Sequence, residues 1–131
     1  MYSKRINIKL AKKLEKLYLK ECYSGSAGYL FKMGHLKMEV GLNKKEYKNI
    51  LEVGAGVSPH IEFIEHKFEN YYCLENSLFC IEEIKKKYPR VNIIQNINEI
   101  SKKNLKFDRI ILSHSLEHLY KPEKYLIKLY N

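Results

Sequence analysis

The chain has 131 residues, of which 45% are hydrophobic and 30% charged, as is typical of one soluble globular domain. No apolar run approaches the ~20 residues of a membrane-spanning helix, and the first residues, MYSKRINIKL, lack the apolar segment of a secretory signal, so we expect a cytoplasmic protein that does not bind membranes. The net charge of +9 is concentrated in residues 1–49, which hold twelve Lys or Arg against four Glu. An anionic partner should meet this basic third, although a solvated lysine-rich face explains the charge as well.

The N-terminal part of the chain predicts two helices. In residues 8–22, Leu10, Leu14, Leu17 and Tyr18 fall on one helical face and the lysines mostly on the others, which indicates an amphipathic helix capped near Asn7. The stretch YSGSAG (23–28) interrupts this pattern. A second helix is expected from about Tyr29 to Val40, ending at Gly41. Residues 1–48 therefore form a basic helical extension.

From residue 49 onward, short apolar runs alternate with helical patterns. The predicted strands are NILEV (49–53), YYCLE (71–75), VNIIQ (91–95) and FDRIILS (107–113). The predicted helices are SPHIEFIEHKF (58–68), SLFCIEEIKKKY (77–88) and PEKYLIKLY (around 122–130). Strands that alternate with helices indicate right-handed crossovers and a parallel sheet covered on both faces. The predicted fold class of residues 49–131 is therefore α/β, with a doubly wound parallel sheet.

A glycine turn follows the first of these strands in ILEVGAGVSP (50–59). Glycines let the backbone turn sharply and approach a ligand without a Cβ, and a helix beginning at Ser58-Pro59 would point its amides at the same crevice. A plain strand-to-helix turn would use glycine in the same way. However, Glu75 ends the second strand, where a carboxylate can accept both hydroxyls of an adenosine ribose. The turn and Glu75 together indicate a nucleoside site.

Two classes of nucleoside cofactor use this arrangement. A dinucleotide site has the pattern G-x-G-x-x-G, and here Pro59 stands in the third glycine position, which disfavours NAD. Glu52, two residues before Gly54, favours the other class. LEVGAG (51–56), LENS (74–77) and FDRIILSHSLEHL (107–119) resemble, in the correct order, three motifs of the class I S-adenosylmethionine-dependent methyltransferases, many of which act on small molecules.

This resemblance implies a Rossmann-like sheet with the visible strand order 3-2-1-4 and S-adenosyl-L-methionine as cofactor. It implies that the methionine end is held by Glu52, Gly54, Ala55 and Gly56, the ribose by Glu75 with Asn76 beside it, and the adenine by Asn96 and Ile97. The family usually has Asp where this chain has Asn96, whose amide oxygen can still accept from the adenine amino group. Ser113 and His114, at the end of the fourth strand, would lie beside the sulfonium.

The sequence HSLEH (114–118) also fits H-x-x-E-H, the inverted zinc-protease motif. A zinc site needs three protein ligands, and the only acid after His118 is Glu123, too near to be the distant third ligand. We therefore expect no metal. Histidine titrates near neutrality, so His114 is the candidate catalytic base for a hydroxyl acceptor, whereas Glu117 and His118 would begin the next helix.

Members of the resembled family continue through three more strands. We therefore expect a chain truncated after the fourth strand, half of a split protein, or a domain whose fourth-strand edge is covered in a homodimer or by a partner chain. The predicted function is methyl transfer to an O or N atom of a small molecule, with residues 1–48 as a lid, or cofactor binding alone. The alternatives are a non-catalytic remnant or partner subunit, and an RNA methyltransferase, which the absence of an aromatic-interleaved basic motif disfavours.

Overall fold

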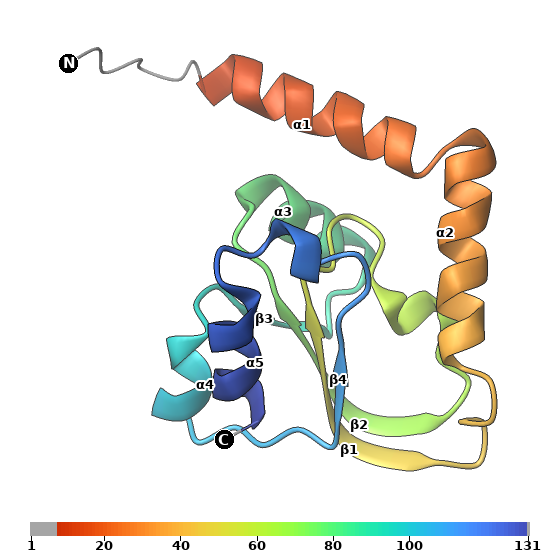
Figure 1. The fold of residues 1–131 in the computed structure, drawn as a ribbon, viewed down its shortest axis with the longest axis vertical. Helices are drawn as coiled ribbons and strands as arrows, with labels where there is room; N and C mark the ends of the chain where they lie inside the picture. The colour runs from red at the N-terminus through yellow and green to blue at the C-terminus, as the bar shows by residue number, and fades with distance from the viewer. Residues whose placement is uncertain (1–7, 131) are drawn as a thin grey trace. The chain divides into compact units, whose positions relative to one another are not determined.

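The computed structural model describes residues 8–130, which fall into two compact units, one ending at Met38 and one beginning at Glu39. The first unit holds α1 (Ile8–Cys22) and α2 (Gly25–Met38), drawn in red and orange in Figure 1. α1 has the predicted bounds, and the cap predicted at Asn7 lies outside the described residues. The role of the extension as a lid stays a prediction.

The second helix begins at Gly25 rather than near Tyr29, so the prediction placed its start too late. The interruption in the sequence is only a short turn, in which the Gly28 amide already donates to the Ser24 carbonyl at 3.0 Å. A Cβ on Gly28 would lie 2.6 Å from the carbonyl oxygen of Tyr23. The glycine in this stretch therefore allows the chain to turn tightly into the helix instead of keeping it extended.

The second unit contains a four-stranded parallel sheet of order β3-β2-β1-β4, as predicted (Figure 1). Its strands are β1 (Glu46–Val53), β2 (Lys67–Leu74), β3 (Asn92–Ile94) and β4 (Arg109–Ile111). In the register of the sheet, Ile50 of β1 lies opposite both Tyr71 of β2 and Arg109 of β4. Because neighbours in register point to the same face of a sheet, these three side chains share one face.

Three α-helices accompany the strands: α3 (Leu78–Lys87), α4 (Asn98–Lys102) and α5 (Pro122–Tyr130). α3 is capped by Ser77, whose Oγ accepts from the Cys80 amide at 3.3 Å. α3 and α5 were predicted, whereas the short α4 was not. Within residues 8–130, none of the helices combines the length and apolar character needed to cross a membrane.

The helix predicted over residues 58–68 is wrong. The structure has only the 3₁₀ helix η1 (His60–Phe63) there, and Lys67 already belongs to β2. Pro59 is extended, with φ −63° and ψ 150°, and the His60 amide is bound by the Glu52 carboxylate instead of a helical carbonyl. The amides of a regular helix therefore do not line the crevice after the glycine turn. A contact across the fold has replaced the local helical hydrogen bond.

The two faces of the sheet differ in chemistry. One face carries the apolar core, in which Leu51 and Val53 pack with Leu74, Ile94 and Ile100. Side chains of α5 also pack against this core, and α4 and α5 lie side by side in Figure 1. The other face carries buried polar groups, because Glu52 alternates with Leu51 and Val53 along β1. Ile50 and Ile111 are also buried on this second face, so apolar packing and a polar network share it.

Candidate functional site

The carboxyl ends of β1 and β2 bring the predicted glycine turn and Glu75 together. Gly54 and Gly56 both have left-handed backbones, with φ of 71° and 60°. The Gly54 amide donates to the Leu74 carbonyl at 2.9 Å, which extends the pairing of β1 and β2 into the turn. The Gly56 amide then donates to Oε2 of Glu75 at 3.1 Å. Ala55, between the glycines, is buried.

Glu75 is held by three backbone amides at once. Its Oε1 accepts from the amides of Asn76 and Ser77, both at 2.9 Å, while its Oε2 accepts from Gly56. The predicted ribose acid therefore faces the glycine turn and the beginning of α3. A carboxylate has about four lone-pair sites, so about one remains for a hydroxyl donor while these bonds persist, and accepting both ribose hydroxyls requires one amide bond to be shared or released. Asn76 contributes its backbone to this arrangement, and its side chain is exposed.

The loop after β4 meets the same turn through Ser115. A Cβ added to Gly54 would lie 2.9 Å from the Cβ of Ser115, closer than real Cβ atoms approach. Ser115 is 4% exposed, and its Oγ is buried without a hydrogen-bond partner within the described part of the chain. A buried hydroxyl left unsatisfied costs about 1–3 kcal/mol. The turn thus has an unused polar atom beside it, which fits the binding of a polar ligand.

Replacing Gly54 by Ala is expected to lower the free energy of unfolding by about 2–3 kcal/mol. The left-handed backbone accounts for one part of this loss and the contact with Ser115 for the other. The double variant Gly54→Ala with Ser115→Gly should recover only the contact part. Urea unfolding of the wild type and both variants measures the two parts. Equal stability of wild type and Gly54→Ala would contradict this account.

The carboxylate of Glu52 lies on the buried polar face beneath the turn. It accepts from the His60 amide through both oxygens, at 3.0 and 2.9 Å, and from the Tyr71 hydroxyl at 2.7 Å. Burial raises the pKa of Glu52 to about 7 and the charge of Glu75 adds to this, against the opposing effect of the two hydrogen-bond donors. The Glu52 carboxylate is thus bound by groups inside the protein, and its predicted contact with the methionine end of the cofactor stays a prediction.

The two residues predicted to contact adenine follow β3. The end of β3 lies beside Glu75, because the Glu75 amide donates to the Ile94 carbonyl at 2.9 Å. Asn96 is exposed, and its Oδ1 accepts from the Asn98 amide at 2.9 Å at the start of α4. Ile97 packs against the apolar core. Their contact with adenine stays a prediction.

The two residues predicted to lie beside the sulfonium follow β4. Ser113 is half-buried, whereas the His114 side chain is 60% exposed, with its Nδ1 3.9 Å from Oε1 of Glu117. The His114 backbone is left-handed, with φ of 51°, which is uncommon outside glycine. Such backbones often occur at functional sites, and this one presents His114 to solvent just after the strand end.

The segment HSLEH does not form one α-helix. Glu117 and His118 lie in the 3₁₀ helix η2 (Leu116–His118), and the following helix, α5, begins only at Pro122, so the prediction that these two residues begin that helix is wrong. The two histidines therefore do not stand one α-helical turn apart, as the zinc motif requires. Among residues 8–130, no three His, Cys, Asp or Glu side chains are grouped as metal ligands.

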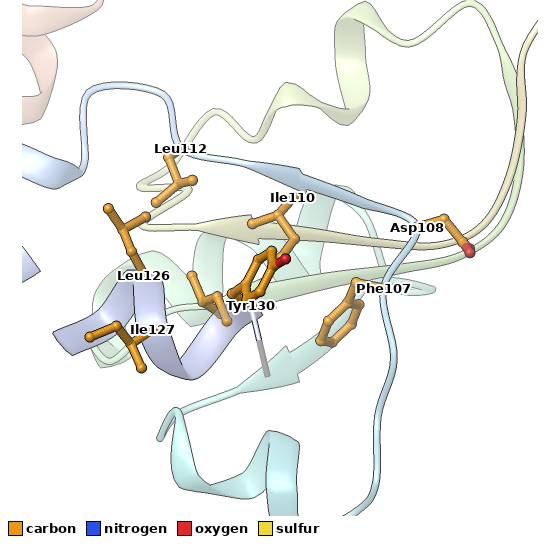
Figure 2. A pocket seen from close by; sticks show the side chains of 8 residues that line it. Phe107, Asp108, Ile110, Leu112, Leu126, Ile127 and Tyr130 are labelled. Atoms are coloured by element: carbon orange, nitrogen blue, oxygen red, sulfur yellow. The ribbon is translucent and has the colours of Figure 1, made fainter. Parts of the chain in front are cut away.

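A separate hollow lies between β4 and α5, away from the glycine turn (Figure 2). Its lining is mostly apolar and comprises Phe107, Asp108, Ile110, Leu112, Leu126, Ile127, Leu129 and Tyr130. The only carboxylate among these, that of Asp108, accepts from the amides of Lys48 and Asn49, both at 2.8 Å. The hollow therefore offers mainly apolar surface, and its carboxylate is bound by backbone amides.

The structure brings together the glycine turn and Glu75, which the sequence singled out, and adds four residues that the sequence did not indicate. Ser115 touches the turn, Tyr71 holds Glu52, and the buried pair Glu39 and Arg109 lies on the polar face. Each depends on a contact between distant segments. The only local signal was the polar character of Arg109 in an otherwise apolar strand.

Comparison with solved structures supports the fold. Three solved structures of the plantazolicin methyltransferase BpumL are similar to this chain. Two are complexes with SAH and a desmethylPZN analog: the monoazolic one has a TM-score of 0.68 and 14% identity, and the pentazolic one a TM-score of 0.66 and 16% identity. The third is a complex with SAH, with a TM-score of 0.62 and 15% identity. The alignments cover 92%, 90% and 97% of this chain, and 49%, 47% and 49% of BpumL. The chain thus spans about half the length of these structures.

A search of curated protein sequences finds no match. A family model described as "Methyltransferase domain" matches residues 51–131, which is more than half of the chain. The match begins in β1 and includes the glycine turn, Glu75 and the loop after β4. The solved structures agree with the observed strand order and fold. The family predicted from the three motifs is thereby confirmed, and the chain belongs to the methyltransferase domain family.

Proposed function

We propose that the chain binds S-adenosylmethionine at the carboxyl ends of β1 and β2 and transfers its methyl group to an O or N atom of a small molecule. The observation that carries this proposal is the contact between the Gly56 amide and the Glu75 carboxylate. It supports a nucleoside site because the turn that lacks side chains and the acid that can bind a ribose face one another. SAH in the BpumL complexes supports the same cofactor class.

The residues of this site have separate roles in the proposal. Gly54 and Gly56 let the methionine end approach the backbone, and Glu75 accepts the ribose hydroxyls. The buried Oγ of Ser115 supplies a further hydrogen-bonding group beside the turn. S-adenosylmethionine provides an activated methyl group on a sulfonium, so the chain contributes mainly alignment and exclusion of water.

Isothermal titration calorimetry tests the proposed cofactor. We expect S-adenosylmethionine and S-adenosylhomocysteine to bind with one site per chain and NAD not to bind. The alternative is a non-catalytic methyltransferase-like domain or partner subunit. Absence of binding at millimolar cofactor would favour that alternative, as would binding without methyl transfer to any acceptor.

His114 is proposed as the catalytic base because its imidazole is 60% exposed just after the end of β4, where a substrate hydroxyl could reach it. We expect His114→Ala to lower the rate of methyl transfer to a hydroxyl by about 10²–10⁴-fold, with S-adenosylmethionine affinity changed little. The measurement uses S-adenosylmethionine carrying a labelled methyl group and a panel of phenols and amines. His118→Ala, on the neighbouring 3₁₀ helix, is the matched control. Unchanged transfer by His114→Ala would exclude this role.

We also propose that a second polypeptide, either another copy of this chain or a partner chain, covers the β4 edge. Among the described residues 8–130, β4 pairs with β1 alone, and three apolar side chains of α5 are exposed: Leu126 by 43%, Ile127 by 60% and Tyr130 by 93%. For a homodimer, sedimentation should show association that Ile127→Lys weakens and Lys124→Ala leaves intact. A monomer at every concentration would contradict self-association.

A further inference from the structure

Four charged or polar side chains form a buried group on the polar face of the sheet, which we call the Glu39 cluster: Glu39, His60, His66 and Arg109. Glu39 is 8% exposed, His60 0% and His66 5%, and the Arg109 side chain is 11% exposed. They come from four separate segments: Glu39 from the loop before β1, His60 from η1, His66 from the position just before β2, and Arg109 from β4. Burial of charge is unfavourable unless each charge is paired, so such a cluster requires a close hydrogen-bond arrangement.

Glu39 is the centre of this arrangement. Its Oε1 accepts from Nε2 of His60 and from the Arg109 guanidinium, both at 2.5 Å. Burial acts to raise the pKa of Glu39, but the hydrogen bonds from Arg109 and His60 outweigh it and keep the pKa below its ordinary value. The carboxylate is therefore ionised, and the guanidinium beside it balances its charge.

The hydrogen bonds of the cluster also assign the proton positions on both histidines. Nε2 of His66 lies 2.6 Å from Arg109 Nη1, which can only donate, so His66 accepts there and carries its proton on Nδ1, facing the Lys67 carbonyl at 3.1 Å. His60 donates from Nε2 to Glu39. Burial lowers the pKa of His60 despite the opposing effect of Glu39, so this histidine is neutral. One negative and one positive charge thus remain in the cluster.

His60 connects the Glu39 cluster to the glycine turn. Its side chain is bound by Glu39, and its backbone amide is bound by Glu52, which in turn accepts from the Tyr71 hydroxyl. Glu39 and Glu52, which come from different segments, therefore both bind His60, and His60 lies four positions after Gly56. The Gly56 amide is the donor to Glu75. Anything that moves His60 changes the end of the short segment that carries this amide.

The geometry points to Glu39 and Arg109 as positioning residues for cofactor binding, which act on the glycine turn through His60. This inference rests on the proposed function, since the turn and Glu75 form the proposed S-adenosylmethionine site. Arg109 holds the Glu39 carboxylate, Glu39 holds the His60 imidazole, and His60 fixes the end of residues 56–60. Glu39 and Arg109 therefore act on the cofactor indirectly, through His60 and the segment that it ends.

The test uses Glu39→Gln, which keeps the size of the side chain and removes its charge, and Leu129→Ala as a matched control. Leu129 packs on the opposite, apolar face of the sheet, so its variant lowers stability without touching the cluster. We expect Glu39→Gln to weaken S-adenosylmethionine binding by about tenfold or more, as for the loss of a hydrogen bond, and the control to bind as the wild type does. If Glu39→Gln does not fold, the double variant Glu39→Gln with Arg109→Met, which removes both charges of the ion pair, is used in its place.

Amide hydrogen exchange gives the readout that a purely structural role would not move. In Glu39→Gln, the amides of Gly56 and His60 should exchange at least about tenfold faster than in the control at equal global stability. If the wild type binds the cofactor, and Glu39→Gln and the control show the same cofactor affinity and the same amide exchange rates, the positioning role alone is overturned. Wild type that fails to bind S-adenosylmethionine would overturn the proposed function, and the positioning role with it.

Discussion

Replacing Glu75 by Gln is expected to weaken S-adenosylmethionine binding by about 10²-fold. Hydrogen bonds to a charged group contribute about 1.5–3 kcal/mol each, and the carboxylate can accept both ribose hydroxyls. The substitution also turns one acceptor oxygen into an NH₂ donor, which must then face the amide of Gly56 or those of Asn76 and Ser77. The glycine turn would lose part of its own support together with the ligand contact. Isothermal titration calorimetry measures the loss.

The control for this experiment is Glu46→Gln, at the amino end of β1. Its carboxylate makes an exposed ion pair with Lys67, with side chains 70% and 85% exposed, and exposed pairs contribute little to stability. It lies at the opposite end of the strand from the turn, so cofactor affinity should not change. Adenosine should lose affinity for Glu75→Gln by a similar factor, because the acid would contact its ribose. Equal affinity of wild type and Glu75→Gln would exclude Glu75 from the site.

The second large effect concerns the dependence of stability on pH. Burial raises the pKa of Glu52 from its ordinary value of 4.5 to about 7. Between these values the unfolded chain releases its proton while the folded chain retains it. The folded state then binds more protons, so the contribution of Glu52 to stability falls as pH rises through this window. The loss is about 3 kcal/mol, from about 1.4 kcal/mol for each pH unit.

Urea unfolding of wild type and Glu52→Gln between pH 4.5 and 8 isolates this contribution. The amide does not titrate, so the free energy of unfolding of the variant should lack the fall caused by Glu52. The difference between the two proteins is the relevant quantity, because Glu39, whose pKa is lowered, contributes stability that is lost as pH falls. Relative to wild type, Glu52→Gln should gain stability toward pH 8. Parallel pH profiles of the two proteins would contradict a raised pKa of Glu52.

The order of the strands followed from the sequence because each strand is short, apolar and separated from the next by a crossover. α5 was predicted with its observed bounds because Pro122 suits the first turn of a helix. The helix expected over residues 58–68 failed because its decisive hydrogen bond joins His60 to Glu52, which no local pattern encodes. The local helix propensity of this segment does not determine its structure, because the buried Glu52 carboxylate binds the His60 backbone amide.

α4 shows the opposite case, because a local signal was present and was not used. Glu99 Oε1 accepts from the amides of Gln95 and Asn96 at 3.1 and 3.2 Å, as the acid at position N3 of a capping box does. The spacing Asn96-x-x-Glu99 therefore predicts the start of a helix. Its five residues are too few for hydrophobic periodicity, so only the cap could have identified it.

The candidate site was predictable where one residue type is tied to one backbone conformation or one strand end, as with Gly54 and Glu75. Ser115 was not predictable, because no sequence pattern distinguishes a functional serine in a loop. Its place in the candidate site depends on its lying against Gly54. Arg109 was visible as a charge inside an apolar strand, but its partner Glu39 lies seventy residues away. Pairings of this kind become apparent only in three dimensions.

The three amides that bind Glu75 have a consequence for the kinetics of recognition. A free glutamate side chain loses rotational freedom when a ligand immobilises it, which subtracts from affinity. Here that freedom is already given up during folding, since the Asn76 and Ser77 amides orient the carboxylate before any nucleoside arrives. An incoming sugar therefore meets a rigid acceptor, and variants that loosen this acid should slow capture as well as shorten residence.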